Sequence, residues 1–121
     1  MSKDKLYIFD TTLRDGAQTQ GVDFSLDDKL KIANSLDALG VDYIEGGWPG
    51  ANPTDTEFFQ KKIKYKNSIL TSFGMTKRTG RSAENDPGLS ALLDSNTKAV
   101  CLVGKSWDFH VDVALGITKE E

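Results

Sequence analysis

Short runs rich in β-branched and aromatic residues recur along this chain, each followed by a polar or amphipathic stretch. Four such runs are predicted to be strands because they are short, apolar and bounded by polar or glycine-rich segments. They are residues 5–10 (KLYIFD), 41–45 (VDYIE), 68–73 (SILTSF) and 98–103 (KAVCLV).

A helix is predicted after each of these runs. The clearest is Ser25–Leu39, where Ser25 and Asp28 form a capping-box pattern and Gly40 follows the end. Thr54 and Glu57 repeat the capping-box spacing and predict a second helix that runs to about Lys64. The remaining helices are predicted to begin at Pro87 after an Asp86 cap, and near Trp107 after a Ser106 or Asp108 cap. The apolar face of the first helix is Leu26, Leu30, Ala33, Leu36 and Leu39.

The order βαβαβαβα predicts an α/β fold with parallel strands. The pattern alone fits either a doubly wound sheet or part of a (β/α)8 TIM barrel. A complete barrel typically needs about 250 residues and eight strands, whereas this chain has 121 residues. We therefore expect residues 1–121 to be a fragment that forms the first half of such a barrel.

Composition and charge limit the classes of partner that we expect for this chain. A formal charge of −3 gives no general attraction to nucleic acid or to anionic membranes, and no apolar run approaches the length of a membrane span. The polar start MSKDK is not a signal peptide, and a single cysteine fits a reducing compartment. We predict a cytoplasmic protein that binds neither nucleic acid nor membrane.

The segment from Asp10 to Gln18 (DTTLRDGAQ) follows the first predicted strand. Sites in parallel α/β folds gather at the carboxyl ends of strands. Asp15 offers a hard oxygen to a divalent cation, and Arg14 offers planar donors to a carboxylate or a developing enolate oxygen. The alternative is a surface ion pair in a tight turn.

DTTLRDGAQ resembles the signature D-x-T-L-R-D-G-x-Q of the family that contains isopropylmalate, homocitrate and citramalate synthases, together with hydroxymethylglutaryl-CoA lyase. The segments IEGGWPGANPTD, SFGMTKRTGRSAENDPGL and LVGKSWDFHV are similar to the citramalate synthase branch. The resemblance implies a metal-dependent TIM-barrel acyltransferase of leucine or isoleucine biosynthesis. Such an enzyme condenses acetyl-CoA with a 2-oxo acid, here pyruvate, to a hydroxy diacid such as citramalate.

The resemblance also implies roles for single residues. Asp15 matches the ligand of a divalent cation (Mg, Mn or Zn), and Arg14 matches the residue that neutralises charge on the keto oxygen. Gln18 matches a substrate-pocket residue. Glu45 is either catalytic at the keto-acid site or a structural partner of Arg14. The basic loop after the third strand, with Lys77, Arg78 and Arg81, either binds CoA phosphates or a substrate carboxylate, or is a solvated loop.

One departure from the family pattern is large. The other metal ligands of the family come from a His-x-His motif, whereas this sequence has only His110. We therefore expect the 121-residue chain alone to be inactive. A second interpretation is a half-barrel that exposes strand edges and an apolar face and acts only by self-association, as a homodimer. A third keeps the fold and substitutes cleavage of a hydroxyacyl-CoA, the lyase reaction.

Overall fold

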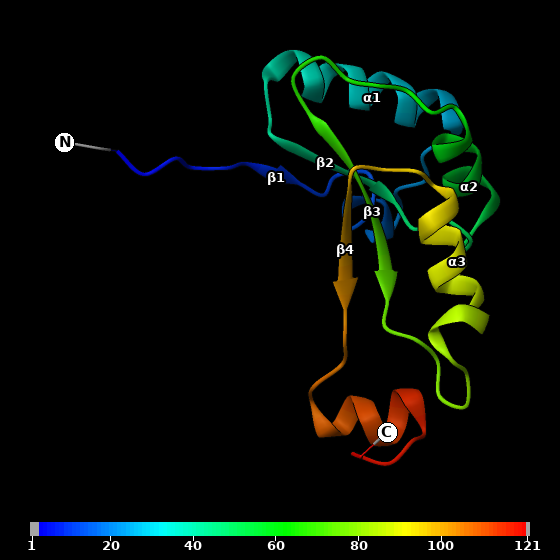
Figure 1. The fold of residues 1–121 in the computed structure, drawn as a ribbon. Coiled ribbons are helices and arrows are strands. Elements are labelled where there is room, and N and C mark those ends of the chain that lie inside the picture. The colour runs from blue at the N-terminus through cyan, green and yellow to red at the C-terminus, as the bar shows by residue number, and fades with distance from the viewer. Residues whose placement is uncertain (1–2, 121) are drawn as a thin grey trace.

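The computed structural model describes residues 3–120, which form one parallel sheet with helices on one side (Figure 1). The strand order is β1-β2-β3-β4, and every neighbouring pair is parallel. The predicted α/β class with alternating strands and helices is confirmed, and this arrangement is consistent with the first half of a TIM barrel. The strands are β1 (Phe9–Asp10), β2 (Tyr43–Gly47), β3 (Ile69–Met75) and β4 (Ala99–Val103).

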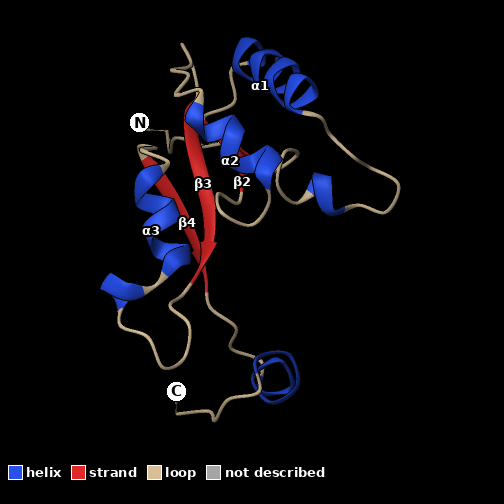
Figure 2. Ribbon diagram, turned by 90° about the vertical axis from the view of Figure 1, so that its right-hand side faces the viewer, coloured by secondary structure: helices blue, strands red, loops and turns tan. Residues whose placement is uncertain are grey.

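Three α-helices connect the strands, and Figure 2 shows them packed beside the sheet. The α-helices are α1 (Leu26–Leu39), α2 (Pro53–Gln60) and α3 (Pro87–Asp94). The shorter helical segments are the 3₁₀ turns η1 (Gly16–Gln18) and η2 (Ala83–Asn85) and the π-helix η3 (His110–Leu115).

The predicted capping of α1 is confirmed. Ser25 Oγ accepts from the Asp28 N–H, and the Asp28 carboxylate accepts from the Ser25 N–H. Gly40 ends the helix at φ 89°, which is the left-handed region that favours glycine. The predicted apolar face of α1 needs two corrections. Leu39 is 77% exposed, and Lys29, which was not predicted to lie on this face, is buried. Leu39 lies in the last turn, past the part of the helix that contacts the sheet.

The predicted cap of α2 is wrong. Asn52, not Thr54, precedes the helix, and its side-chain oxygen accepts from the Asp55 N–H. Pro53 occupies the first helical position, where its fixed φ favours helix initiation and its missing N–H costs nothing. The helix ends at Gln60 rather than Lys64, because Lys62 adopts φ 50° and cannot continue it.

The first strand is also shorter than predicted. Only Phe9 and Asp10 pair with β2, at Tyr43 and Ile44. Ile8 is still tied to the start of β2, since its carbonyl accepts from the Asp42 and Tyr43 N–H groups. The preceding segment extends away from the body, as Figure 1 shows in blue. Those residues have no neighbouring strand to pair with, so β-rich composition alone does not make them a strand.

The predicted fourth helix has an irregular form. Asp108 and Phe109 begin a helical turn that continues as the π-helix η3, and no side chain caps η3. The predicted Ser106 or Asp108 cap is therefore wrong for η3, although Asp108 Oδ1 accepts from the Phe109 N–H. Figure 1 shows this segment beyond the ends of β3 and β4, where it covers neither strand. Within residues 3–120 no helix is both long and apolar enough to span a bilayer.

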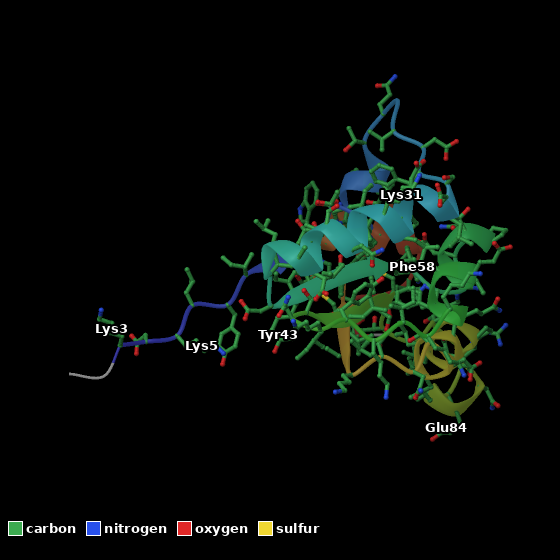
Figure 3. All side chains as sticks on the ribbon, turned by 90° about the horizontal axis from the view of Figure 1, so that it is seen from above. Lys3, Lys5, Lys31, Tyr43, Phe58 and Glu84 are labelled. Carbon is green, nitrogen blue, oxygen red and sulfur yellow. The ribbon has the colours of Figure 1, made fainter. Side chains whose placement is uncertain are left out.

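The two faces of the sheet differ in what covers them. The helix-side core comprises Leu13, Ala33, Val41, Ile44, Phe58 and Phe59. In Figure 3, Phe58 lies in this interior, whereas Lys31 points outward from α1.

Side chains alternate between the faces of a strand. A Cβ at Gly46 would meet Phe58, so Glu45 points to the face opposite the helices. The register pairs Glu45 with Thr71, and Phe73 with Cys101, which places all four on that face. Tyr43, at the start of β2, shares this face, and its ring packs against those of Tyr7 and Phe9. In a closed barrel this face is the interior.

Candidate active site

The DTTLRDGAQ segment folds into a tight turn at the carboxyl end of β1. The Asp10 carboxylate accepts from the backbone N–H and the hydroxyl of Thr12. The Thr11 carbonyl then accepts from the N–H groups of three successive residues, Arg14, Asp15 and Gly16. This turn fixes the backbone from which the Arg14 side chain reaches across the sheet.

Arg14 extends over the face opposite the helices and meets Glu45 of β2. Arg14 Nε donates to Glu45 Oε1 at 2.5 Å, and the guanidinium carbon lies 4.1 Å from the centre of the Phe73 ring on β3. The Glu45 side chain is fully buried, and that of Arg14 is 19% exposed. Ion pairing and cation–π contact together hold the planar guanidinium in one place at the strand ends.

Asp15 lies beside this pair but points to solvent. Its Oδ1 is 3.6 Å from Arg14 Nη1, and its side chain is 65% exposed. A divalent cation needs several oxygen or nitrogen ligands. No group of three or more His, Cys, Asp or Glu side chains among residues 3–120 could hold one. The described side chains therefore do not form a metal centre of three or more such ligands, and the role predicted for Asp15 stays a prediction.

A cavity of about 360 Å³ opens next to Arg14. Gln18 lines it together with Arg14, so the structure brings these two predicted residues to one site. Trp48 forms another wall and packs edge-on against Phe73, with ring centres 5.1 Å apart. The lining combines such apolar walls with polar and charged side chains, including those of Lys29 and Asp55.

Lys77 and Arg78 are not brought to this cavity. Both are exposed in the loop after β3, and neither is among the residues that line it. The Arg78 backbone N–H donates to Asp86 Oδ2, which ties the loop to the start of α3. The structure thus separates the two basic loop residues from Arg14, Gln18 and Glu45.

A second buried ion pair borders the cavity, and sequence reasoning missed it. Lys29 Nζ lies 2.5 Å from Asp55 Oδ1 and donates to the Leu13 carbonyl at 3.0 Å. The other oxygen of Asp55 accepts from the Trp48 N–H. This pair joins α1, α2, the turn before Arg14 and the start of the β2–α2 loop. The signal was present, because Lys29 lies on the same side of α1 as Leu26 and Ala33.

The arrangement suits an anionic oxygen. The Arg14 guanidinium is held at the carboxyl end of the sheet, beside a cavity and largely shielded from solvent. In that position it stabilises negative charge better than a guanidinium in bulk water does. Of the Arg14 guanidinium nitrogens, Nε donates to Glu45, whereas Nη1 lies 3.6 Å from the exposed Asp15 carboxylate. The Nη groups are therefore the donors that this geometry offers to a bound oxygen.

Comparison with known proteins supports this interpretation. A protein-family model described as HMGL-like matches residues 5–121. An (R)-citramalate synthase from Aquifex aeolicus is 53% identical over 98% of this chain. Another from Streptomyces coelicolor is 51% identical over 98% of it. A 2-isopropylmalate synthase from Sulfolobus acidocaldarius is 33% identical over the whole chain.

These matches cover only part of each relative. The chain spans 23% of the Aquifex citramalate synthase and 30% of the Sulfolobus isopropylmalate synthase. The predicted resemblance, including its bias toward the citramalate branch, is confirmed by these identities.

Proposed function

Because the chain belongs to the HMGL-like family, we propose that residues 1–121 are the first half of a TIM-barrel acyltransferase that condenses acetyl-CoA with a 2-oxo acid. The identity to (R)-citramalate synthases favours pyruvate as the 2-oxo acid and citramalate as the product. The observation that carries the proposal is the Arg14 guanidinium, fixed by buried Glu45 and by Phe73 beside a cavity.

In this reaction the enolate carbon of acetyl-CoA bonds to the keto carbon of the 2-oxo acid. The carbonyl electron pair moves onto oxygen, which takes a proton to become the hydroxyl. Water then cleaves the thioester and releases CoA as a free thiol. The Nη donors of Arg14 stabilise the negative charge on that oxygen, and Glu45 orients the guanidinium from below.

The other predicted residues act around this centre. We propose that Gln18, on the wall of the same cavity, binds the 2-oxo acid. Asp15 contributes one carboxylate to a divalent cation whose other ligands lie outside residues 3–120. Lys77 and Arg78, exposed after β3, lie apart from the cavity, so a contact with substrate would be with the distant phosphates of CoA.

The test is release of free thiol from acetyl-CoA by the longer protein that carries this chain, with pyruvate and other 2-oxo acids compared. We expect the highest kcat/KM with pyruvate. Replacing Arg14 with Ala should lower kcat/KM by about 10²–10³-fold, as for the loss of one donor to a developing oxyanion. Lys31→Ala, which removes an exposed cation of α1, is the control and should leave the rate unchanged. Absence of thiol release with every 2-oxo acid would reject the proposal.

Self-association is a second candidate, because the open face and edges carry exposed apolar side chains. Leu6 is 80% exposed and Tyr7 is 55% exposed beside the β1 edge. Unpaired strands at a sheet edge are ready to pair with another chain. We propose that the 121-residue chain forms a homodimer through this region. Sedimentation at several concentrations should then show a dimer, and a monomer at every concentration would contradict it.

A further inference from the structure

Glu45 is an incompletely satisfied buried carboxylate. Its Oε1 accepts from Arg14, but its Oε2 has no hydrogen-bond partner among residues 3–120, and the side chain is fully buried. An ionised carboxylate can accept several hydrogen bonds, and leaving one oxygen unpaired in the interior is costly. Something on this face should therefore donate to Oε2.

Thr71 presents the complementary group. It is the Cα partner of Glu45 on β3, points to the same face and is only 1% exposed. Its Oγ1 also has no hydrogen-bond partner in the described chain. Neighbouring strands lie about 4.8 Å apart, and the two groups make no hydrogen bond to each other in the structure. One bound water between them would satisfy both.

Cys101 of β4 lies against the same carboxylate. Burial raises the pKa of its thiol, and the charge and hydrogen bonding of Glu45 raise it further, while Arg14 opposes them. No contact of full hydrogen-bond geometry reaches Oε2, so we take the thiol as a close electrostatic neighbour. Glu45, Thr71 and Cys101 thus lie on three adjacent strands of one face.

We propose that Thr71 and Cys101 are positioning residues of the candidate site: the Thr71 hydroxyl donates through one water to Oε2 of Glu45, and the Cys101 thiol, on the same face of the sheet, experiences the charge of the same carboxylate. Glu45 is thereby held in the single orientation that keeps the Arg14 guanidinium over Phe73. The inference rests on the proposed function only in that Arg14 and Glu45 act on substrate.

The single cysteine makes this unit measurable without any enzyme activity. Because the chain has one cysteine, the pH dependence of its alkylation by iodoacetamide reports Cys101 alone. Only the thiolate reacts with iodoacetamide, so the alkylation rate plotted against pH has its midpoint at the pKa of the thiol. At a pH below this midpoint, the rate falls about tenfold for each pH unit by which the midpoint rises. We expect a higher midpoint in the native 121-residue chain than in the same chain in concentrated urea.

Two substitutions probe the partners. Glu45→Gln removes the negative charge and should speed alkylation at neutral pH by roughly threefold or more. Thr71→Val keeps the shape but removes the donor, so the full carboxylate charge faces the thiol and alkylation should slow by roughly twofold. Thr71→Ser keeps the hydroxyl and should behave as the unmodified chain. Thr79→Val, in the exposed loop after β3, is the matched control.

The direction in which Thr71→Val changes the alkylation rate distinguishes a positioning role of Thr71 from a merely structural one. A merely structural role would loosen the packing and speed alkylation, so unchanged or faster alkylation in a folded Thr71→Val chain overturns the proposal. If Thr71→Val unfolds while Thr71→Ser matches the unmodified chain, the hydroxyl is still the required group, which supports it. Equal alkylation of the native and urea-treated chain contradicts it. These results do not depend on thiol release from acetyl-CoA, so the two proposals can fail separately.

Discussion

Two buried ion pairs flank the candidate site, and they differ in how completely they are satisfied. On the helix side, Lys29 bonds both Asp55 and the Leu13 carbonyl, and both Asp55 oxygens are engaged. On the opposite face, Arg14 bonds Glu45, but Oε2 of Glu45 has no partner in residues 3–120. The first pair is closed within the described chain, and the second is open.

This difference between the two ion pairs helps to distinguish a pair that stabilises the fold from one that serves function. A closed buried pair strongly destabilises the fold when one partner is lost, because a charge is left uncompensated. Arg14 keeps some contact with solvent and has Asp15 Oδ1 3.6 Å from its Nη1, so neutralising Glu45 should harm stability less. We therefore propose that the Lys29–Asp55 pair serves the fold and that the Arg14–Glu45 pair serves function.

The largest expected effect is on the closed pair. Lys29→Met keeps the side-chain length but leaves Asp55 without its cation and the Leu13 carbonyl without its donor. We expect the free energy of unfolding to fall by about 3–5 kcal/mol in urea titrations. Lys31→Met is the matched control, because its pair with Asp27 is solvent-exposed and its loss should have a much smaller effect on stability. Similar losses in the two variants would break the comparison.

The next effect concerns the glycine that lets the closed pair form. Gly47 has φ 150°, and a Cβ there would lie 2.6 Å from the Asp55 carboxyl carbon and 2.9 Å from Lys29 Nζ. Gly47→Ala should cost about 2 kcal/mol or more, from overpacking and backbone strain together. Gly80→Ala is strained by its φ of 75° but meets nothing within 4 Å, so it should cost less. Thermal unfolding of both variants compares them directly, and an equal loss would remove the steric argument.

A smaller effect tests the corrected start of α2, which carries Asp55. Asn52→Ala removes the side-chain acceptor for the Asp55 N–H and should cost about 1 kcal/mol. Thr54→Ala, at the cap predicted from sequence, should cost less than about 0.5 kcal/mol. Urea titration of the two chains gives the ranking, and the reverse order would restore the sequence-based cap.

The smallest expected effect is on acid stability. Backbone N–H donors from Arg78 and Leu89 lower the pKa of Asp86 from its ordinary 3.8. A carboxyl whose pKa is lower in the folded state stabilises the fold above its ordinary pKa and loses that contribution as pH falls through the lowered value. Asp86→Asn should therefore flatten the acid limb of a plot of melting temperature against pH. An unchanged acid limb would contradict this assignment.

Local patterns predicted local structure well. The capping box at Ser25 and the glycine at position 40 fixed α1 because each acts within a few residues. The start of α2 was missed because Thr54 and Glu57 mimic a capping box, whereas Asn52 before Pro53 was the stronger signal. The short β1 could not be predicted, since its length depends on a partner strand.

The sequence predicted the motif of the candidate site but not the buried residues that surround it. Arg14, Asp15 and Gln18 are close together in the sequence, so the motif alone places them near one another. The structure also shows the contact between Arg14 and Glu45, which was one of the two roles expected for Glu45. Lys29 was missed although it shares a face of α1 with Leu26 and Ala33. Thr71 was missed because sequence alone does not say which face of a parallel strand meets the helices. That choice emerges only from the register of β2, β3 and β4.

The most direct measurement compares the unfolding free energies of Glu45→Gln and Asp55→Asn in the same buffer. Each replaces a buried, ion-paired carboxylate by its isosteric amide. We predict that Glu45→Gln changes stability by less than about 1 kcal/mol, because the amide oxygen still accepts from Arg14 Nε and the partly exposed Arg14 keeps Asp15 as a nearby counter-charge. Asp55→Asn should lose about 3 kcal/mol or more, because Lys29 is left buried without a counter-charge. Equal losses would contradict the division between a structural and a functional pair.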